Sequence, residues 1–199
     1  MTEDLLRYYN TLHSREAYGD TSVKNLPYIA GLVAALKPET IVDYGCGQSA
    51  LHKHLVRITG AKVTRYDPAI PELSVSPAGR YDLLVNIDVL EHVPEDELAP
   101  LIQHMQSLAV KAIIVIDTGP AVQFLPDGRN AHLTEKPAEW WAEQLRPFYP
   151  YLRPIRVRSK RRAAFVTWPQ PYRPFKDKLY FLREEVRYKL GRLFSTFRS

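Results

Sequence analysis

The segment 41–50, Ile-Val-Asp-Tyr-Gly-Cys-Gly-Gln-Ser-Ala, has the pattern of a loop that binds a nucleotide-like ligand. Gly45 and Gly47 fall where an apolar run ends and a helical stretch begins. Glycine at such a junction lets a ligand come close to the backbone, and the first turn of the helix offers free N–H groups. The spacing Gly45-x-Gly47-x-x-Ala50 also fits a dinucleotide fingerprint, so the glycines alone do not decide the ligand.

Two acidic residues narrow the choice. Asp43 lies two residues before the first glycine, where it can accept a hydrogen bond from a cationic amino-acid ligand and would repel a pyrophosphate. Asp67 ends the next apolar run and is placed to bind ribose hydroxyls. Either acid can instead be a structural turn residue, but together they favour a ligand that joins an amino acid to a nucleoside.

A second cluster follows the apolar run that ends near Ile87. If the chain turns helical there, Asp88, Glu91 and His92 share one face by their spacing of three and four residues. Two carboxylates and an imidazole form a divalent-metal site with open positions, and His132 is a natural further ligand. The alternative is that His92 orients a substrate or closes a turn. The remaining histidines that have no partner pattern are expected at the surface: His52, His54 and His104.

Alternating apolar and helical stretches must position these residues. Strands are expected over 40–44, 61–66, 81–87 and 111–117, with helices over 22–36, 49–59, 95–108 and 136–146. This alternation predicts a parallel sheet covered on both faces, closed by an antiparallel pair at 151–158 and 163–168. A further short helix is expected over 2–12.

Two stretches break the alternation. Residues 67–80 contain three prolines and a glycine, so at most a short strand around 73–75 fits there. Residues 119–131 form a long loop of the kind that often serves as a lid over a functional site.

The motif Asp43-Tyr44-Gly45-Cys46-Gly47, followed by Asp67 and by Leu90-Glu91-His92-Val93, resembles the class I S-adenosylmethionine-dependent methyltransferases. The resemblance covers roughly 23–168. It implies an α/β, Rossmann-like sandwich with a mostly parallel seven-stranded sheet, one strand short or missing, and the cofactor across the carboxyl ends of the strands. By this analogy Asp43 and Gly45 hold the methionine part and Asp67 the ribose. The full cofactor site implied is Asp43, Gly45, Cys46, Gly47, Asp67 and Ile87.

The chain departs from the family pattern in two places. Ser49 stands at the usual third glycine position, and the shortened segment 67–80 lacks the usual acidic contact to adenine.

The later pattern Asp-x-x-Glu-His with a distant histidine is similar to that of ubiquinone-pathway O-methyltransferases and of small-RNA methyltransferases that modify a terminal ribose. This resemblance implies Mg²⁺ or Mn²⁺ bound to two adjacent oxygens of a diol or catechol, which would lower the pKa of the hydroxyl to be methylated. The catalytic and metal-binding set expected is Asp88, Glu91, His92 and His132. Asp88 replaces the more usual glutamate and has a shorter reach.

The charge of the chain is unevenly distributed. Of 199 residues with a net charge of +5, residues 1–152 carry 13 basic and 19 acidic side chains, whereas 153–162 carry six basic and no acidic ones, and 173–199 carry eight basic and three acidic ones. Such blocks are suited to phosphate, anionic lipid or nucleic acid, or to a solvated surface. The single cysteine, Cys46, excludes an intrachain disulfide, and no run is long enough to cross a bilayer, so we expect a cytoplasmic protein.

These observations predict three parts: a methyltransferase domain over 1–168, a proline-rich linker over 169–175 and a basic amphipathic helix over 176–199. The helix has an apolar stripe formed by Leu179, Leu182, Val186, Leu190, Leu193 and Phe197. The stripe suits packing on the domain, pairing with a partner helix, or lying in a membrane interface, and the last would place the protein on the inner face of the membrane.

The expected activity is methylation of a hydroxyl on a glycan, a lipid-linked sugar or another diol-bearing small molecule. One alternative is an RNA methyltransferase that uses the basic segment 153–162, with nucleic acid the less favoured partner. Another is a module that binds a nucleotide without catalysis, or an NAD-dependent oxidoreductase of related fold.

Overall fold

The computed structural model describes residues 8–11, 20–170 and 173–196. Within these ranges residues 8–11 form one helical turn, and the rest of the helix expected over 2–12 lies outside the described residues. Helices and strands alternate along the remaining chain as the sequence predicts, so the elements that carry the candidate site can be compared one by one.

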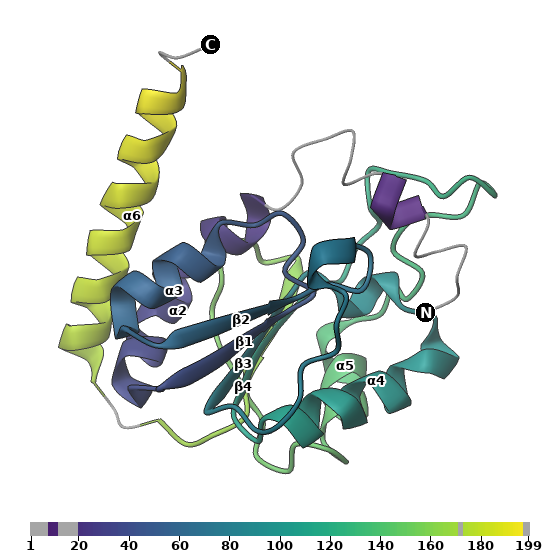
Figure 1. Cartoon of the computed structure of the whole chain (residues 1–199), viewed down its shortest axis with the longest axis horizontal. Helices are drawn as coiled ribbons and strands as arrows, with labels where there is room; N and C mark the ends of the chain where they lie inside the picture. Colours follow the sequence, from purple (N-terminus) through teal and green to yellow (C-terminus); the bar gives the residue numbers. More distant parts are fainter. Residues whose placement is uncertain (1–7, 12–19, 171–172, 197–199) are drawn as a thin grey trace.

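A six-stranded sheet forms the centre of the molecule (Figure 1). Its strands are β1 (Thr40–Tyr44), β2 (Lys62–Tyr66), β3 (Leu83–Ile87), β4 (Ala112–Asp117), β5 (Arg153–Pro154) and β6 (Arg162–Val166), in the order β2-β1-β3-β4-β6-β5. The first four are parallel, and β6 runs antiparallel to both β4 and β5. The prediction of a mostly parallel α/β sheet with a closing antiparallel strand is confirmed.

The seventh strand of the family pattern is missing at the β2 edge. Residues 67–80, all of which the structure describes, contain a 3₁₀ turn over Pro71–Leu73 and no strand, so the short strand expected around 73–75 is wrong. The prolines of this segment lack the N–H groups that a sheet ladder needs. Its backbone instead closes on itself, with the Asp67 N–H bonded to the Leu73 carbonyl at 3.1 Å.

Two layers of helices cover the sheet and bury alternate strand residues. Helices α2 (Asp20–Leu36) and α3 (Leu51–Thr59) cover one face, and α4 (Glu95–Leu108) and α5 (Ala138–Leu145) cover the other (Figure 1). In β1, Ile41 packs on the side of α2 and α3, and Val42 packs on the side of α4 and α5, as the two-residue period of a strand requires. Because both faces are covered, the sheet leaves the carboxyl ends of its parallel strands as the place for a site.

The basic helix near the C-terminus is α6 (Pro174–Thr196), and it packs against α2 (Figure 1). The rings of Tyr28 and Phe181 meet at 5.0 Å, and the buried Glu184 accepts hydrogen bonds from Arg57 at 2.5 Å and from Arg187 at 2.9 Å. The division into a domain over 1–168, a linker and a tail remains a prediction, although α6 begins two residues before its expected start.

The close approach of α6 to α2 gives a test of this packing. A Cβ at Gly31 would lie 2.9 Å from the Asp177 carboxylate and 3.1 Å from its Cα. Overpacking costs about 1–3 kcal/mol, and each kcal/mol lowers the Tm of a chain this size by about 2–4 °C. We therefore expect Gly31→Val to lower the Tm, measured by calorimetry, by roughly 2–10 °C. Gly191→Val is the control, because a Cβ at Gly191 meets nothing within 4 Å, and an equal loss in both variants would contradict this contact.

Candidate active site

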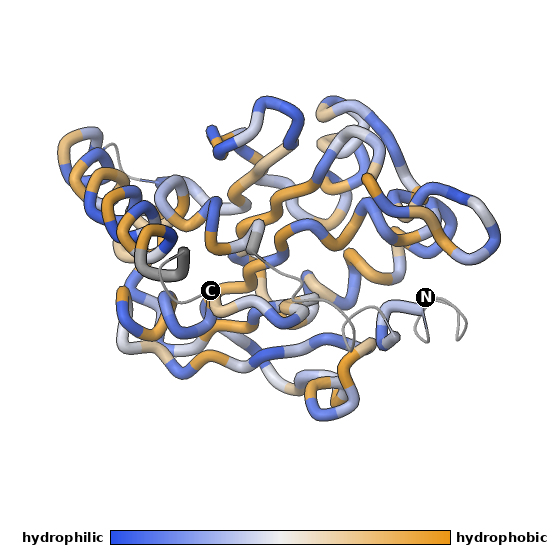
Figure 2. Tube along the Cα trace, turned by 90° about the horizontal axis from the view of Figure 1, so that it is seen from above, coloured by the Kyte–Doolittle hydropathy of each residue, from blue (hydrophilic) through white to orange (hydrophobic). Residues whose placement is uncertain are grey.

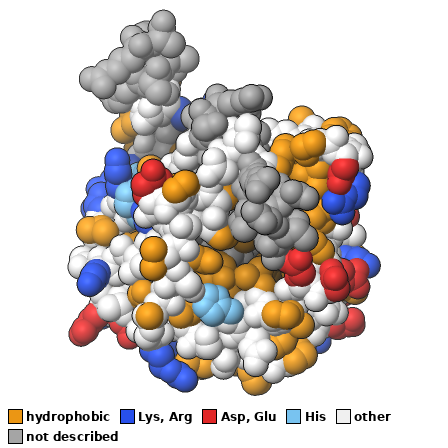
Figure 3. All heavy atoms as spheres, turned by 45° about the vertical axis from the view of Figure 1, so that its right-hand side comes forward, with side chains coloured by type: hydrophobic (Ala, Val, Ile, Leu, Met, Phe, Trp, Pro, Cys, Tyr) orange, Lys and Arg blue, Asp and Glu red, His pale blue; other side chains and the backbone are white. Residues whose placement is uncertain are grey.

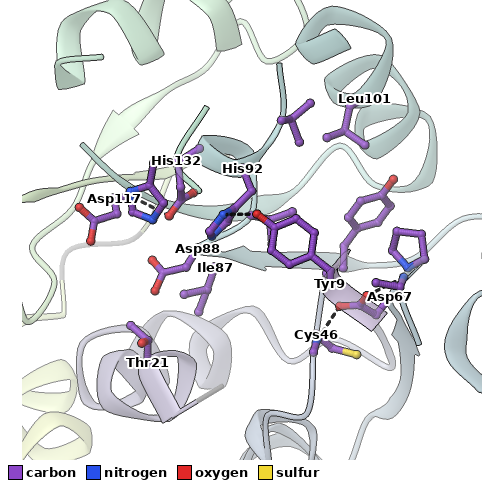
Figure 4. Close-up of a pocket in the computed structure, with 18 of the residues that line it drawn as sticks. Tyr9, Thr21, Cys46, Asp67, Ile87, Asp88, His92, Leu101, Asp117 and His132 are labelled. Carbon is purple, nitrogen blue, oxygen red and sulfur yellow. Dashed lines mark hydrogen bonds between the residues drawn. The ribbon is translucent and has the colours of Figure 1, made fainter. Parts of the chain in front are cut away.

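One cavity of about 980 Å³ opens at the carboxyl ends of the parallel strands (Figures 3 and 4). It is large enough for a cofactor and a second molecule together. The predicted site residues that line it are Gly45, Cys46, Gly47, Asp67, Ile87, Asp88, Glu91, His92 and His132. The structure thus brings the glycine motif and the acid–histidine cluster to the same cavity. Asp43 lies behind the wall, with 4% of its surface exposed.

The glycine loop follows β1 and depends on two left-handed residues. Gly45 has a φ of 73° and Gly47 a φ of 50°. A Cβ at Gly45 would lie 2.4 Å from a methyl group of Val89, so a side chain there would force Val89 away. The N–H groups of Gly45 and Cys46 both donate to the Tyr66 carbonyl, at 2.8 and 3.1 Å, which ties the loop to the end of β2.

The Asp67 carboxylate fastens this loop from the other side. One oxygen accepts the Gly47 N–H at 2.8 Å and the other accepts the Ala69 N–H at 3.0 Å. Asp67 is therefore a turn acid in this structure and at the same time part of the cavity wall. Its predicted contact with a ribose remains a prediction.

Asp43 is a buried carboxylate without a full set of partners. Burial, opposed by the Arg65 guanidinium on the neighbouring strand, raises the pKa of Asp43 to about 7. Its Oδ2 atom has no hydrogen-bond partner among the described residues. A cationic group beside Asp43 would stabilise its ionised form, which is what the sequence predicted for this position.

Glu91 is the most deeply buried acid of the cavity. It lies in the 3₁₀ turn η2 (Leu90–His92), with none of its surface exposed, and one carboxylate oxygen accepts the Asp117 N–H at 3.0 Å. The other oxygen has no partner among the described residues. Burial, reinforced by the nearby Asp88 carboxylate, raises the pKa of Glu91 well above its usual value. The Thr134 N–H fixes the turn by donating to the Glu91 carbonyl at 3.0 Å.

His92 and His132 are both held by backbone carbonyls through Nδ1. His92 Nδ1 lies 3.0 Å from the Ala131 oxygen, and His132 Nδ1 lies 2.5 Å from the Gly119 oxygen. Because a carbonyl only accepts, each Nδ1 carries a hydrogen in these contacts, which leaves the Nε2 of a neutral ring as the atom that can bind a metal ion. Metal-binding histidines are fixed in this way. Burial lowers the pKa of His92 to about 4, so this side chain is neutral at pH 7.

Glu91, His92 and His132 lie close enough together to be able to hold a metal ion. One ligand atom from each lies within 4.8 Å of the other two, and the two rings lie 4.8 Å apart. Two imidazoles and a carboxylate with open positions are a known metal-binding arrangement. The unpartnered oxygen of Glu91 is an additional indication, since a buried carboxylate oxygen gains from a cation.

Asp88 takes a different position from the one expected. The helical face proposed for Asp88, Glu91 and His92 does not form, because Asp88 has a φ of 56° and the following turn is 3₁₀. Its carboxylate accepts two hydrogen bonds from the Arg162 guanidinium, at 2.9 and 3.0 Å. Asp88 therefore lies outside the group of three, and a role as metal ligand would require it to leave Arg162.

The sequence analysis missed many residues that line the cavity, among them Tyr9, His104, Asp117 and Arg161. Asp117 ends β4, at the same sheet edge as the other strand-end acids, so its position was available as a signal. His104 was expected at the surface, but it lines the cavity and bonds to the Tyr44 hydroxyl at 2.9 Å. Nothing in the sequence indicates Tyr9, whose hydroxyl lies 2.8 Å from His92 Nδ1 (Figure 4).

Residues 15–163 match a family model described as a methyltransferase domain. The chain belongs to this methyltransferase family. The match confirms the prediction of a class I S-adenosylmethionine-dependent methyltransferase and favours it over the NAD-dependent oxidoreductase and the module without catalysis. Among proteins of curated function, no sequence matches.

Solved structures show that the fold is the one shared by these methyltransferases. The S-adenosylhomocysteine complex of DhpI has a TM-score of 0.56 and 19% identity, covering 85% of this chain and 97% of DhpI. An O-methyltransferase family protein from Burkholderia thailandensis has a TM-score of 0.54 and 13% identity over 73% of this chain, which spans 56% of that protein. The methyltransferase domain of bacterial CtHen1 has a TM-score of 0.50 and 17% identity, covering 70% of this chain and 95% of that domain.

The raised pKa of Asp43 predicts a pH-dependent affinity for the methyltransferase product. If the ionised carboxylate holds the amino group of S-adenosylhomocysteine, affinity is full above pH 7 and is lost as the pH falls through that value. We expect about a tenfold loss between pH 8 and pH 6 by titration calorimetry. Asp43→Asn should bind more weakly and without this dependence. An unchanged affinity in Asp43→Asn would show that Asp43 is structural.

Proposed function

We propose that this methyltransferase transfers the methyl group of S-adenosylmethionine to a hydroxyl of a diol-bearing acceptor. The observation that carries the proposal is the meeting of the glycine loop and the Glu91–His92–His132 cluster in one cavity. The reaction forms a bond between the acceptor oxygen and the methyl carbon and breaks the bond from that carbon to sulfur. It releases S-adenosylhomocysteine and one proton.

The cofactor would lie along the glycine loop with its methyl group toward Ile87 and η2. Asp43 and Gly45 would hold the amino-acid part of the cofactor, and Asp67 would hold the ribose. Cys46 and Gly47 would line the cofactor with their backbone. Supporting this arrangement, Asp43 keeps an unpartnered oxygen among the described residues and Asp67 lines the cavity. The thiol of Cys46 is uncharged at neutral pH, since burial raises its pKa to about 12, so it would contribute shape and not charge.

Mg²⁺ or Mn²⁺ would be held by Glu91, His92 and His132. When bound, the ion would polarise two adjacent acceptor oxygens and lower the pKa of the hydroxyl to be methylated. The backbone performs the positioning: the carbonyls of Ala131 and Gly119 orient the two imidazoles, and the Asp117 N–H holds Glu91. A hydroxyl held in line with the methyl group would gain from the positioning that such a transfer requires.

Glu91→Gln tests the donor set. We expect Mn²⁺ affinity, measured by titration calorimetry, to fall at least tenfold, and methyl transfer from S-adenosylmethionine to a catechol probe to fall with it. Affinity for S-adenosylhomocysteine should stay the same. Asp96→Asn is the control, because Asp96 is an exposed acid on the cavity wall outside the cluster. Full transfer by Glu91→Gln in the presence of a chelator would exclude the metal.

Tyr9→Phe tests how His92 is oriented. The Tyr9 hydroxyl lies 2.8 Å from His92 Nδ1 and donates to the Ala131 carbonyl at 3.3 Å. Removing a group that orients a metal-binding histidine typically costs tenfold or more in metal affinity, and we expect about tenfold here. Tyr8→Phe is the matched control from the same turn, since its hydroxyl donates to the Phe124 carbonyl at 3.1 Å. Equal affinities in both variants would assign Tyr9 to packing alone.

An RNA acceptor is the weaker alternative. Three of the six basic residues in 153–162 are engaged within the molecule: Arg158 with Glu185, Arg161 with Asp117, and Arg162 with Asp88. Fewer cations are then available for phosphates. An oligonucleotide that ends in a ribose diol is therefore included beside the catechol probe, and a preference for it would favour the RNA reading.

A glycan, a lipid-linked sugar and a quinone precursor are the acceptors that fit a diol-binding cavity. The last two occur at membranes, and we propose a peripheral location on the inner face of the membrane. No described helix is long and apolar enough to span a bilayer. Support for surface binding comes from the basic C-terminal quarter of the chain.

A further inference from the structure

Helix α6 packs on the domain with one face, which is polar and aromatic. Tyr180 packs against the core under α2, and the Tyr188 ring lies 5.0 Å from the Arg158 guanidinium. Glu184, with 2% of its surface exposed, is paired with Arg57 and Arg187.

The opposite face carries the apolar stripe that the sequence analysis identified, extended by Phe175, which was expected in the linker. Its members, which we call the outer stripe, are exposed by 47–81%: Phe175, Leu179, Leu182, Val186, Leu190 and Leu193. Their spacing of three and four residues places them along one line of the helix. Figure 2 shows the hydrophobic and hydrophilic residues alternating turn by turn along α6. Phe197, expected as a further member, lies outside the described residues.

Charge is segregated around the same helix. Among the residues of α6 whose side chains the structure describes, the exposed charged ones are all basic: Lys176, Lys178, Arg183, Arg187, Lys189 and Arg192. The three acids, Asp177, Glu184 and Glu185, are buried or half-buried. Glu185 is paired with Arg158, and Asp177 faces Gly31. The outward side of α6 is therefore apolar along its centre and positive along its edges.

We infer that α6 is a two-faced membrane anchor, fixed to the domain by its inner face and lying on an anionic phospholipid surface by its outer stripe. The inference rests on the proposed membrane location and does not depend on the proposed chemistry. Lysine and arginine beside an apolar stripe extend their charged ends to lipid headgroups while their alkyl parts cover the apolar surface. The helix lies along the interface and does not enter the bilayer as a span.

Other occupants fit the outer stripe less well. A second copy of the chain would bring two rows of like charge together, because the edges of the stripe are basic in both copies. RNA would use the basic edges but would leave five large aliphatic side chains and Phe175 in water. An anionic bilayer satisfies the apolar centre and the charged edges together.

Vesicle co-sedimentation of the full chain tests this surface. We expect binding to phosphatidylglycerol vesicles and little binding to phosphatidylcholine vesicles. Leu182→Ser with Val186→Ser should weaken phosphatidylglycerol binding at least tenfold, because two central members of the stripe become polar. Both residues are half-exposed, at 49% and 55%, so the fold should persist. An unchanged affinity of the variant for S-adenosylhomocysteine would verify, independently of lipid binding, that the variant is folded.

The matched control replaces two exposed valines elsewhere, Val75→Ser with Val110→Ser, whose exposures are 85% and 55%. This variant should bind vesicles as the wild type does. Point variants are preferable to deleting residues 170–199, since deletion would uncover the face of α2 that α6 covers. The inference would be overturned if the wild-type protein did not bind phosphatidylglycerol vesicles. It would also be overturned if the variant with Leu182→Ser and Val186→Ser bound them as strongly as the wild type. A dimer in light scattering that the stripe variant abolishes would assign the surface to a second copy instead.

Discussion

The burial of Glu91 is the constraint on which the rest of the site depends. A carboxylate removed from water is costly unless its oxygens find donors or a cation. The fold supplies one donor, the backbone N–H of Asp117, and fixes the turn beneath it through Thr134. The second oxygen has no hydrogen-bond partner among the described residues, and Glu91 lies beside two imidazoles whose Nδ1 atoms are bonded to backbone carbonyls. This arrangement is unfavourable for a structural acid and favourable for one that binds a cation.

The antiparallel strand β6 balances the negative charge that the parallel strands bring together. Asp88 directly follows β3 and Asp117 ends β4, both near Glu91, and like charges so close oppose one another's ionisation. Arg161 and Arg162 stand at the start of β6, where the antiparallel register places Arg162 opposite Asp117. Their guanidinium groups bond to Asp117 and Asp88. Reversing one strand thus places cations at an edge where parallel strands had placed carboxylates.

The sequence was sufficient for features set by local pattern. The alternation of apolar and helical stretches located β1 to the residue, and the pairing of glycines with strand-end acids located the cavity. It was insufficient where a side chain meets a partner distant in the chain. The pairing of Asp88 with Arg162 joins residues 74 positions apart, and the bond from Tyr9 to His92 joins residues 83 apart. No spacing rule reports such contacts, because they depend on how the sheet closes and on where the first turn of the chain comes to lie.

The same limit explains why the sequence predicted the apolar stripe of α6 but not whether the stripe faces the domain or the solvent. Apolar periodicity identifies a face that avoids water, and in a helix that covers a domain this is usually the face toward the core. In α6 the inner face carries aromatic rings, a buried ion pair and the close contact with Gly31. The aliphatic residues are then left outside, between rows of lysine and arginine. Packing on α2 already accounts for the helix as an element of the fold, so it does not explain why the outer stripe is exposed. An exposed apolar face with basic edges is the kind of surface that a separate, anionic partner would cover, which is why we propose one.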